Sequence, residues 1–141
     1  MLLSLHRPLR PGVGVVTQWF DENPDRYRQW NAAGHTGTDY GCPNGSEVLA
    51  MHDGKVVAVG NDPKGYGLYV KVRGDVCESV YAHLSKRMVK DGDMVAASSV
   101  LGLSGNTGNS TGPHLHVGLR IHGQRNRAYL NYVDFVPFRD I

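Results

Sequence analysis

Short apolar runs separated by turn-forming residues make up most of this chain. Valine and tyrosine alternate with polar residues in five runs, EVLAMHDGKVVAVG, GYGLYVKVRGD, VCESVYAHLS, KDGDMVAASSVLGLSG and HLHVGLRI. Alternation with a period of two is typical of strands that bury one face, and Asp53-Gly54, Gly74-Asp75 and Asp91-Gly92 lie where hairpin turns are expected. The pattern predicts a mainly β fold, either an antiparallel β-sheet groove or a partly open β-sandwich.

The N-terminal part adds one strand and one short helix. The run VGVVTQWF, Val13 to Phe20, predicts the first strand. It is followed by a helix of about one turn, with Asn23 as N-cap and Pro24 as the first helical residue, because proline suits the first position of a helix. No segment has the length and period of a substantial helix.

Composition and charge fit one folded domain. The 141 residues are enough for a single hydrophobic core, so we expect one domain of residues 1–141. Glycine contributes 18 residues, above the usual share of about 7%, which agrees with many turns. A net charge of +2 is too small to indicate nucleic-acid binding, but it is compatible with an anionic, wall-like partner.

Two features bear on the compartment. Cys42 and Cys77 are 35 positions apart and lack C-x-x-C spacing, so we expect buried thiols, with a disulfide as the alternative. The start MLLSLHRPLRPG lacks the apolar region of a secretory signal, and no later segment could span a membrane. We therefore expect either phage-type release of a lysin or a domain cut from a longer secreted chain.

The motif STGPHLHVG places two histidines one residue apart. On a strand, His114 and His116 share one face, with Cβ atoms about 6.5–7 Å apart. Both could bind one zinc ion only in favourable rotamers, because Zn–N bonds are about 2.0–2.1 Å long. A division of labour is easier, in which one histidine holds the ion and the other faces the substrate.

A second motif, GHTGTDYGCP, contains His35 and Asp39. Glycine and threonine make a helix unfavourable here, and on a straight strand residues i and i+4 would be about 13 Å apart. Gly34, Gly37 and Gly41 allow a bend that lets His35 fold back over Asp39. The alternative is a solvated histidine and a turn-forming aspartate.

These motifs together suit a catalytic zinc site. Such a site needs three protein ligands and one open position for water. His35, Asp39 and either His114 or His116 supply that set, and the remaining histidine of the pair would face the substrate. His83, at the end of the strand-like run VYAHLS, is the fifth member, unless it is only a hydrogen-bonded histidine.

From Gly34 to Leu119 the chain closely resembles the lysostaphin-type (LytM-like) zinc metallopeptidases. The resemblance rests, in order, on GHTGTDYGCPNGSEVLAMHDGKVVAVG, GYGLYVKV, SVYAHLS, VKDGDMV and GLSGNTGNSTGPHLHVGL. It implies one zinc ion per chain bound by His35, Asp39 and His116, with His83 and His114 as the catalytic pair. It also implies an antiparallel sheet with the metal on the floor of a groove, and endopeptidase cleavage of peptidoglycan cross-bridges or stem peptides.

The expected chemistry follows from these residues. Zinc lowers the pKa of bound water from 15.7 to about 7, and an imidazole can accept the proton or stabilise the oxyanion. Which of His83 and His114 is the base stays open. The turn SGNTGNSTGP is expected to hold the histidine strand in place, since it lacks the Gly-Lys-Ser/Thr ending of a phosphate-binding loop.

Two other functions were weighed. A catalytically inactive relative would bind wall peptides or activate another hydrolase, but all five chemical positions are retained here. A biotinyl or lipoyl carrier would need an exposed lysine in a tight turn with its acceptor residues, which MHDGKVVAV does not supply. We expect a monomeric lysin, or endolysin, that acts on cell-wall peptides in the extracellular or periplasmic space.

Departures from the resemblance concern Cys42 and the rim of the groove. Cys42 stands where relatives have a small or apolar residue, and we expect it to be buried rather than bound to zinc. Surface or packing roles are expected for Tyr27, Trp30 and Asn126, with groove lining as the alternative.

Overall fold

An open antiparallel β-sheet dominates the computed structural model, which describes residues 3–135. Residues 1–2 and 136–141, which the predicted domain of residues 1–141 includes, lie outside the described residues. The strands are β1 (Val15–Gln18), β2 (Thr38–Gly41), β3 (Glu47–Leu49), β4 (Gly54–Asp62), β5 (Gly67–Arg73), β6 (Cys77–Arg87), β7 (Met94–Val95), β8 (Val100–Ser104) and β9 (His114–Ile121).

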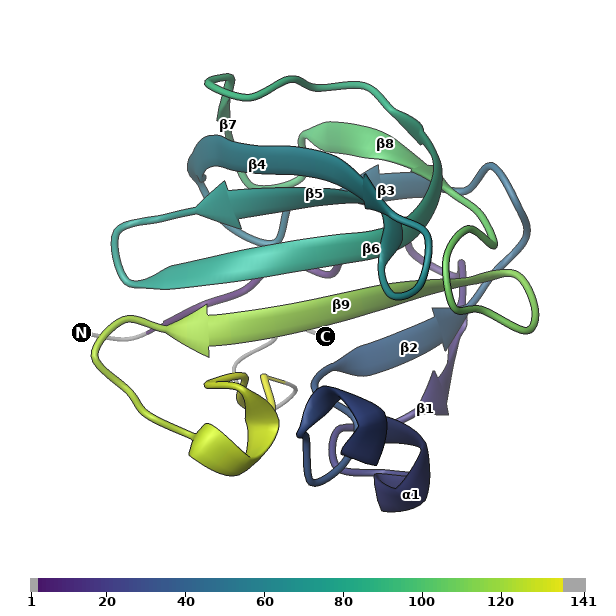
Figure 1. The fold of residues 1–141 in the computed structure, drawn as a ribbon. Helices are drawn as coiled ribbons and strands as arrows, with labels where there is room; N and C mark the ends of the chain where they lie inside the picture. Colours follow the sequence, from purple (N-terminus) through teal and green to yellow (C-terminus); the bar gives the residue numbers. More distant parts are fainter. Residues whose placement is uncertain (1–2, 136–141) are drawn as a thin grey trace.

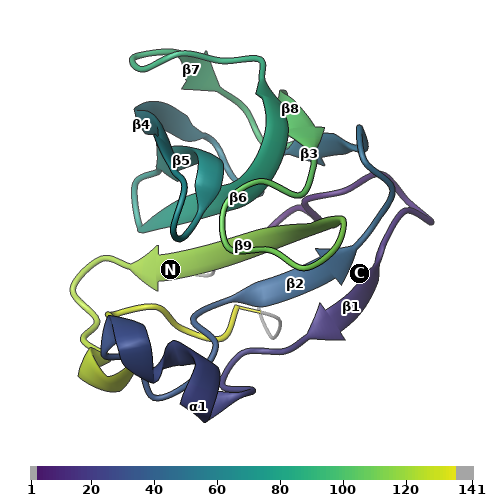
Figure 2. The same ribbon diagram turned by 45° about the vertical axis from the view of Figure 1, so that its right-hand side comes forward.

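The strand order is β1-β2-β9-β6-β5-β4-β7, and a side branch pairs β8 with both β6 and β3 (Figures 1 and 2). A short helix, α1 (Pro24–Tyr27), and the 3₁₀ turns Arg28–Trp30 and Arg127–Tyr129 lie together beside the β1-β2-β9 end of the sheet. The predicted mainly β fold with one short N-terminal helix is therefore confirmed.

The N-terminal predictions hold in outline. The first strand is shorter than the predicted Val13 to Phe20, because only Val15–Gln18 pairs with β2. Pro24 opens α1 as predicted. Asn23 occupies the N-cap position, but it adopts φ 55° and its side chain makes no capping hydrogen bond. The following 3₁₀ turn, rather than a longer helix, carries the chain back toward the sheet.

One of the three expected hairpin turns joins paired neighbours. Gly74-Asp75 connects β5 to β6, which pair along their length. The hairpin predictions at Asp53-Gly54 and Asp91-Gly92 are wrong, because β3 pairs with β8 rather than β4, and β7 pairs with β4 rather than β6. Residues 63–66 instead form the turn between the paired strands β4 and β5.

The core lies against the inner face of the curled sheet. Burying each large apolar side chain stabilises the fold by about 1.5–3 kcal/mol. The largest fully buried side chains of the core are Tyr40, Tyr81, Phe135, Leu5, Leu9, Leu49, Met51, Leu84, Leu101, Leu115 and Leu119. Cys42 and Cys77 are buried free thiols, as expected.

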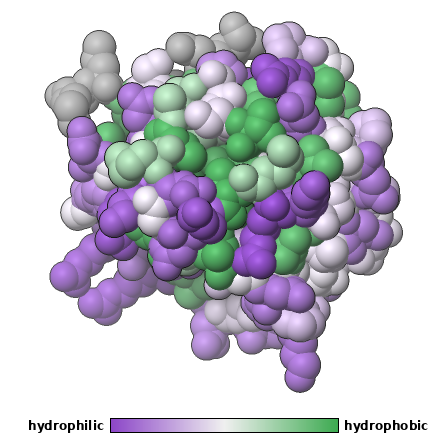
Figure 3. Space-filling view, turned by 90° about the horizontal axis from the view of Figure 1, so that it is seen from above, coloured by the Kyte–Doolittle hydropathy of each residue, from purple (hydrophilic) through white to green (hydrophobic). Residues whose placement is uncertain are grey.

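The outer surface mixes hydrophilic and hydrophobic side chains. Figure 3 shows a hydrophobic area through the middle of the upper face, bordered by hydrophilic side chains. The exposed large hydrophobic residues of the described chain are Val15, Trp19, Met88, Met94 and Leu130. None of the helices within residues 3–135 is long and apolar enough to cross a membrane.

Strand β6 changes its pairing partner at His83. Up to Ala82, which is paired with His116, β6 runs beside β9, and from Leu84, paired with Ser104, it runs beside β8. His83 itself adopts φ 62°, a left-handed backbone conformation that is uncommon outside glycine. His83 therefore lies at the point where the two partner strands, β9 and β8, diverge.

Candidate metal centre

Two neighbouring strands bring an aspartate and a histidine face to face. Asp39 on β2 is the direct register partner of His116 on β9. Directly opposite residues of an antiparallel pair project to the same face, so their side chains meet. His116 Nδ1 lies 3.0 Å from Asp39 Oδ1. The sheet register alone therefore brings together two of the three candidate ligand residues.

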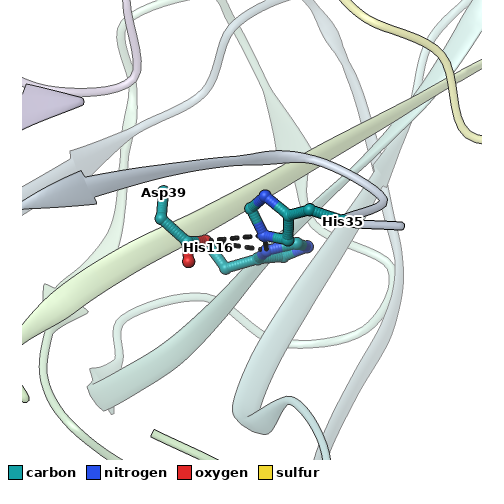
Figure 4. A group of neighbouring side chains, drawn as sticks. All are labelled: His35, Asp39 and His116. Carbon is teal, nitrogen blue, oxygen red and sulfur yellow. Dashed lines mark hydrogen bonds and ion pairs between the residues drawn. The ribbon is translucent and has the colours of Figure 1, made fainter. Parts of the chain in front are cut away.

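The segment before β2 bends to add His35. Its Nε2 lies 3.1 Å from Asp39 Oδ1 and 3.0 Å from His116 Nδ1 (Figure 4). The bend needs glycine at position 37, because a Cβ there would collide with the main-chain carbonyl of Val117. The expected fold-back of His35 over Asp39 is thus present.

The chemistry of these three atoms suits a metal cation. His35 Nδ1 donates to the Trp19 carbonyl at 3.0 Å, so the neutral ring presents a lone pair from Nε2. A carboxylate oxygen and an imidazole nitrogen complete a triangle with edges of 3.0–3.1 Å. Tetrahedral bonds of about 2.0–2.1 Å place ligand atoms about 3.3 Å apart, so the donor set fits such an ion.

Burial shapes the charge states of the ligand candidates. Exposed fractions are 1% for His35, 7% for Asp39 and 5% for His116. Burial alone would raise the pKa of Asp39, but the adjacent His116 and His35 rings, 3.0 and 3.1 Å from its Oδ1, outweigh burial and hold this pKa well below its usual range. Burial lowers the pKa of His116. The carboxylate is therefore ionised and His116 is neutral, the forms that bind metal.

His116 differs from His35 in the nitrogen that it turns toward the cluster. Its Nδ1 faces the cluster, while its buried Nε2 has no hydrogen-bond partner among the described residues. The ring is held by packing instead, with the Tyr66 ring 5.7 Å away between centroids. Tyr66 in turn donates a hydrogen bond to the Tyr132 hydroxyl at 3.0 Å.

His83 and His114 lie beside this cluster. Their ring centroids are 4.6 Å apart, and His114 Nε2 lies 3.6 Å from Asp39 Oδ2. His83 Nδ1 donates to the Thr107 carbonyl at 2.7 Å, and His114 Nδ1 lies 2.8 Å from the Gly112 carbonyl. Both carbonyls belong to the turn SGNTGNSTGP, which therefore aims both Nε2 atoms at the site.

The environment also sets the pKa of His83. Burial, followed by the nearby His116 and His114, lowers this pKa from 6.5 to about 4. His83 is therefore neutral near pH 7 and can accept a hydrogen bond or a proton through Nε2.

A groove of about 500 Å³ runs over these side chains. Tyr27 and Trp30 line it, which is the alternative to the surface or packing roles expected for them, whereas the lining residues within the described chain do not include Asn126, which donates to the Tyr132 carbonyl. Sequence analysis missed Gln18 and Asn109 in the lining. Cys42 packs in the core cluster and is not part of the His35, Asp39 and His116 set.

Comparison with known proteins identifies the family. The sequence description of Peptidase family M23 matches residues 33–128, which is more than half of the chain. The chain belongs to peptidase family M23. Membership of this metallopeptidase family implies a metal cofactor, and the three-residue cluster is a suitable site for it. All five candidate site residues of this M23 chain fall within the matched range.

Several relatives are similar over most of the M23 range. Peptidoglycan DD-endopeptidase ShyA of Vibrio cholerae is 44% identical over 92 residues, 65% of this chain and 21% of that protein. Glycyl-glycine endopeptidase ALE-1 of Staphylococcus capitis is 44% identical over 88 residues, 61% of this chain and 24% of that protein. The M23 chain thus spans about a fifth of the length of the curated relatives that it matches.

The fold is shared with the solved catalytic domain of a peptidase. The catalytic domain of the antimicrobial peptidase lysostaphin from Staphylococcus simulans superimposes with a TM-score of 0.68 at 35% identity. The match covers 75% of this chain and 79% of that domain. The open antiparallel sheet described above is therefore a lysostaphin-like fold.

Proposed function

We propose that this chain is a zinc-dependent endopeptidase that hydrolyses peptide bonds in bacterial peptidoglycan. The observation that carries the proposal is the convergence of His35 Nε2, Asp39 Oδ1 and His116 Nδ1, with edges of 3.0–3.1 Å, on the floor of an open groove. The names of the relatives, DD-endopeptidase and glycyl-glycine endopeptidase, support a wall peptide as the substrate.

Each residue of the site has a role in this proposal. His35, Asp39 and His116 hold one zinc ion, which when bound supplies Lewis-acid activation of water and of the scissile carbonyl. His83 and His114 contact the reacting atoms through Nε2, where they accept a proton from the attacking water or donate a hydrogen bond to the developing oxyanion. Their Nδ1 contacts to main-chain carbonyls fix both rings for these tasks.

The setting of this activity is proposed with it. Residues 1–141 act as one monomeric domain on the wall, in the extracellular or periplasmic space. Phage-type release, as for an endolysin, and origin from a longer secreted protein are the two proposed routes by which the domain reaches the wall. The second candidate, an inactive wall-binding relative, has less support because all five chemical side chains are present and gathered around one groove.

Digestion of purified peptidoglycan tests the proposal. The zinc-loaded protein is incubated with walls of the diaminopimelate type and the glycine-bridge type, and mass spectrometry identifies the new peptide ends. We expect soluble fragments from at least one wall type, no cleavage after chelation, and recovery when zinc is restored. New amino ends on glycine or on diaminopimelate identify the bond.

A binding assay on the same walls separates the two candidate functions. Zinc-loaded protein that sediments with walls but releases no fragment from either type would contradict hydrolysis and favour the binding relative. Cleavage that persists at full rate after complete removal of metal would contradict the metal-dependent chemistry.

A further inference from the structure

Gln18 is placed beside the metal centre by the sheet itself. It ends β1 and is the register partner of Asp39 on β2, so both side chains project to the same face. The pairing follows a β-bulge between Val16 and Gln18, which sets the direction of the Gln18 side chain. Gln18 is 8% exposed and lines the groove together with Asp39.

Only one end of the Gln18 carboxamide is used within the protein. Its Oε1 accepts a hydrogen bond from the Tyr27 hydroxyl at 3.0 Å. Its buried Nε2 has no partner, one of three such side-chain atoms in the part of the chain that the structure describes. Buried donors are rarely left unpaired in folded proteins, so this amide has the character of a group that awaits a ligand.

Three histidines of the groove are paired within the protein through Nδ1. His35, His83 and His114 each have Nδ1 next to a main-chain carbonyl, which leaves their Nε2 atoms for the metal or for proton transfer. A peptide in the groove carries a carbonyl oxygen at every residue and needs hydrogen-bond donors from the side chains that line the groove. The Gln18 amide supplies two N–H groups, and its terminal torsion is soft enough to turn them toward the groove.

We infer that Gln18 binds the substrate by donating a hydrogen bond from Nε2 to a main-chain carbonyl of the wall peptide, next to the bond that is cleaved. The adjacency follows from the Asp39 pairing, since directly opposite Cα atoms lie about 4.5–5.5 Å apart. The inference rests on the proposed peptidase function and adds a substrate-binding residue to it. Tyr27 holds the carboxamide by its oxygen and so directs the nitrogen.

Side-chain amide NMR tests this contact directly. The chain has three glutamines, and loss of one signal pair in Gln18→Met assigns Gln18, while Gln29 and Gln124 serve as internal references. The zinc-loaded protein is titrated with the tetrapeptide stem of diaminopimelate-type peptidoglycan. We expect the Gln18 amide signals to shift with saturation and the two reference signals to stay in place.

The other outcomes of the titration are equally informative. Shifts at the backbone amides of Tyr66 and Asn109 without any shift at Gln18 would show that the peptide binds elsewhere on the groove wall and would overturn the inference. No shift in any groove residue, together with no wall cleavage, would contradict the proposed peptidase function itself.

Kinetics separates substrate contact from mere support of Tyr27. Gln18→Met removes both hydrogen bonds at similar volume, Tyr27→Phe removes only the bond to Gln18, and Gln29→Met is the matched control on an exposed glutamine. We expect KM to rise about tenfold in Gln18→Met, less in Tyr27→Phe and not at all in the control, with metal content unchanged.

A double variant completes the test. If Gln18→Met, Tyr27→Phe and their combination all change KM and kcat equally, Gln18 acts only by orienting Tyr27, and the inference is wrong. If Gln18→Met lowers folding yield, the NMR titration of the unaltered protein still decides the question.

Discussion

Two groups of buried polar side chains lie on or next to the same sheet. One is the cluster of His35, Asp39 and His116, and the other is the network of His52, Ser79 and Tyr81. In the network, His52 Nδ1 donates to the Asp53 carbonyl at 2.9 Å, and Ser79 Oγ lies 2.8 Å from both His52 Nε2 and the Tyr81 hydroxyl. At the other end of this hydrogen-bond network, the Tyr81 hydroxyl accepts from the Met51 N–H at 2.9 Å.

The two groups differ in how their hydrogen-bonding capacity is used. In the His52 network both ring nitrogens and both hydroxyl groups have protein partners, so it stabilises the fold and has nothing to offer a ligand. In the metal cluster, lone pairs converge on one point and His116 Nε2 has no partner. Burial of a histidine therefore indicates function only when its nitrogen atoms are not already paired within the protein.

The largest expected effect is loss of metal from His116→Ala. The substitution removes one of three ligand atoms, so metal content should fall from one ion per chain to nearly none, and wall cleavage should fall to background. Mass spectrometry of bound metal after dialysis measures this. The control variant His52→Gln, in the other buried group, should retain one metal ion per chain. Full metal content in His116→Ala would contradict the ligand assignment.

His114→Ala should lose turnover but keep the metal. Because His114 lies beside the cluster and contributes no atom to the triangle, metal content should stay near one per chain. Turnover should fall by about 10²–10⁴, the usual contribution of a general acid or base. The assays are bound-metal analysis and the rate of release of wall fragments. Equal metal loss in His114→Ala and His116→Ala would overturn the division of roles.

Tyr81→Phe should affect stability alone. It removes the hydroxyl that accepts from the Met51 N–H and contacts Ser79, and it leaves a buried donor unpaired. The free energy of unfolding should fall by about 1–3 kcal/mol, measured by denaturant titration. Metal content and turnover per folded molecule should not change, and a selective loss of turnover would link the two groups.

The smallest effect concerns pH and His52. Burial lowers the pKa of His52 below 6.5, so below that pH the unfolded chain takes up a proton that the folded chain resists. The stabilising contribution is complete above about pH 6.5 and is lost as the pH falls toward the folded-state pKa.

Denaturant titrations of metal-free protein at pH 8 and pH 5 measure this contribution. The stability advantage of the unaltered protein over His52→Gln should shrink on acidification. The exposed His6→Gln variant is the matched control for the loss of a histidine. An advantage that grows at low pH would contradict the sign.

The sequence predicted the main parts of the site because these parts are local. Alternation on β9 placed His114 and His116 on one face, and glycines in GHTGTDYG allowed the bend at His35. The resemblance then chose His116 over His114 as the ligand, which agrees with the three atoms that the structure brings together. Chemical roles remain predictions until the variants are measured.

The missed features are non-local or belong to the main chain. Pairing of β3 with β8 and of β7 with β4 depends on how the sheet curls, so dipeptides such as Asp53-Gly54 could not identify it. The carbonyls of Trp19 and Thr107, which orient His35 and His83, have no side-chain signature. Gln18 is a single glutamine whose significance depends on its register with Asp39.

The left-handed backbone at His83 has a consequence for substitution at this position. A non-glycine residue in this conformation costs about 1–2 kcal/mol, which is close to the gain from its hydrogen bond to the Thr107 carbonyl. Replacement by glycine would relieve this backbone strain but would also remove the buried ring and its hydrogen bond, so the effects on folding stability oppose each other. The proposed chemistry would lose its imidazole outright, so a glycine at position 83 would affect the proposed activity more than it affects the architecture.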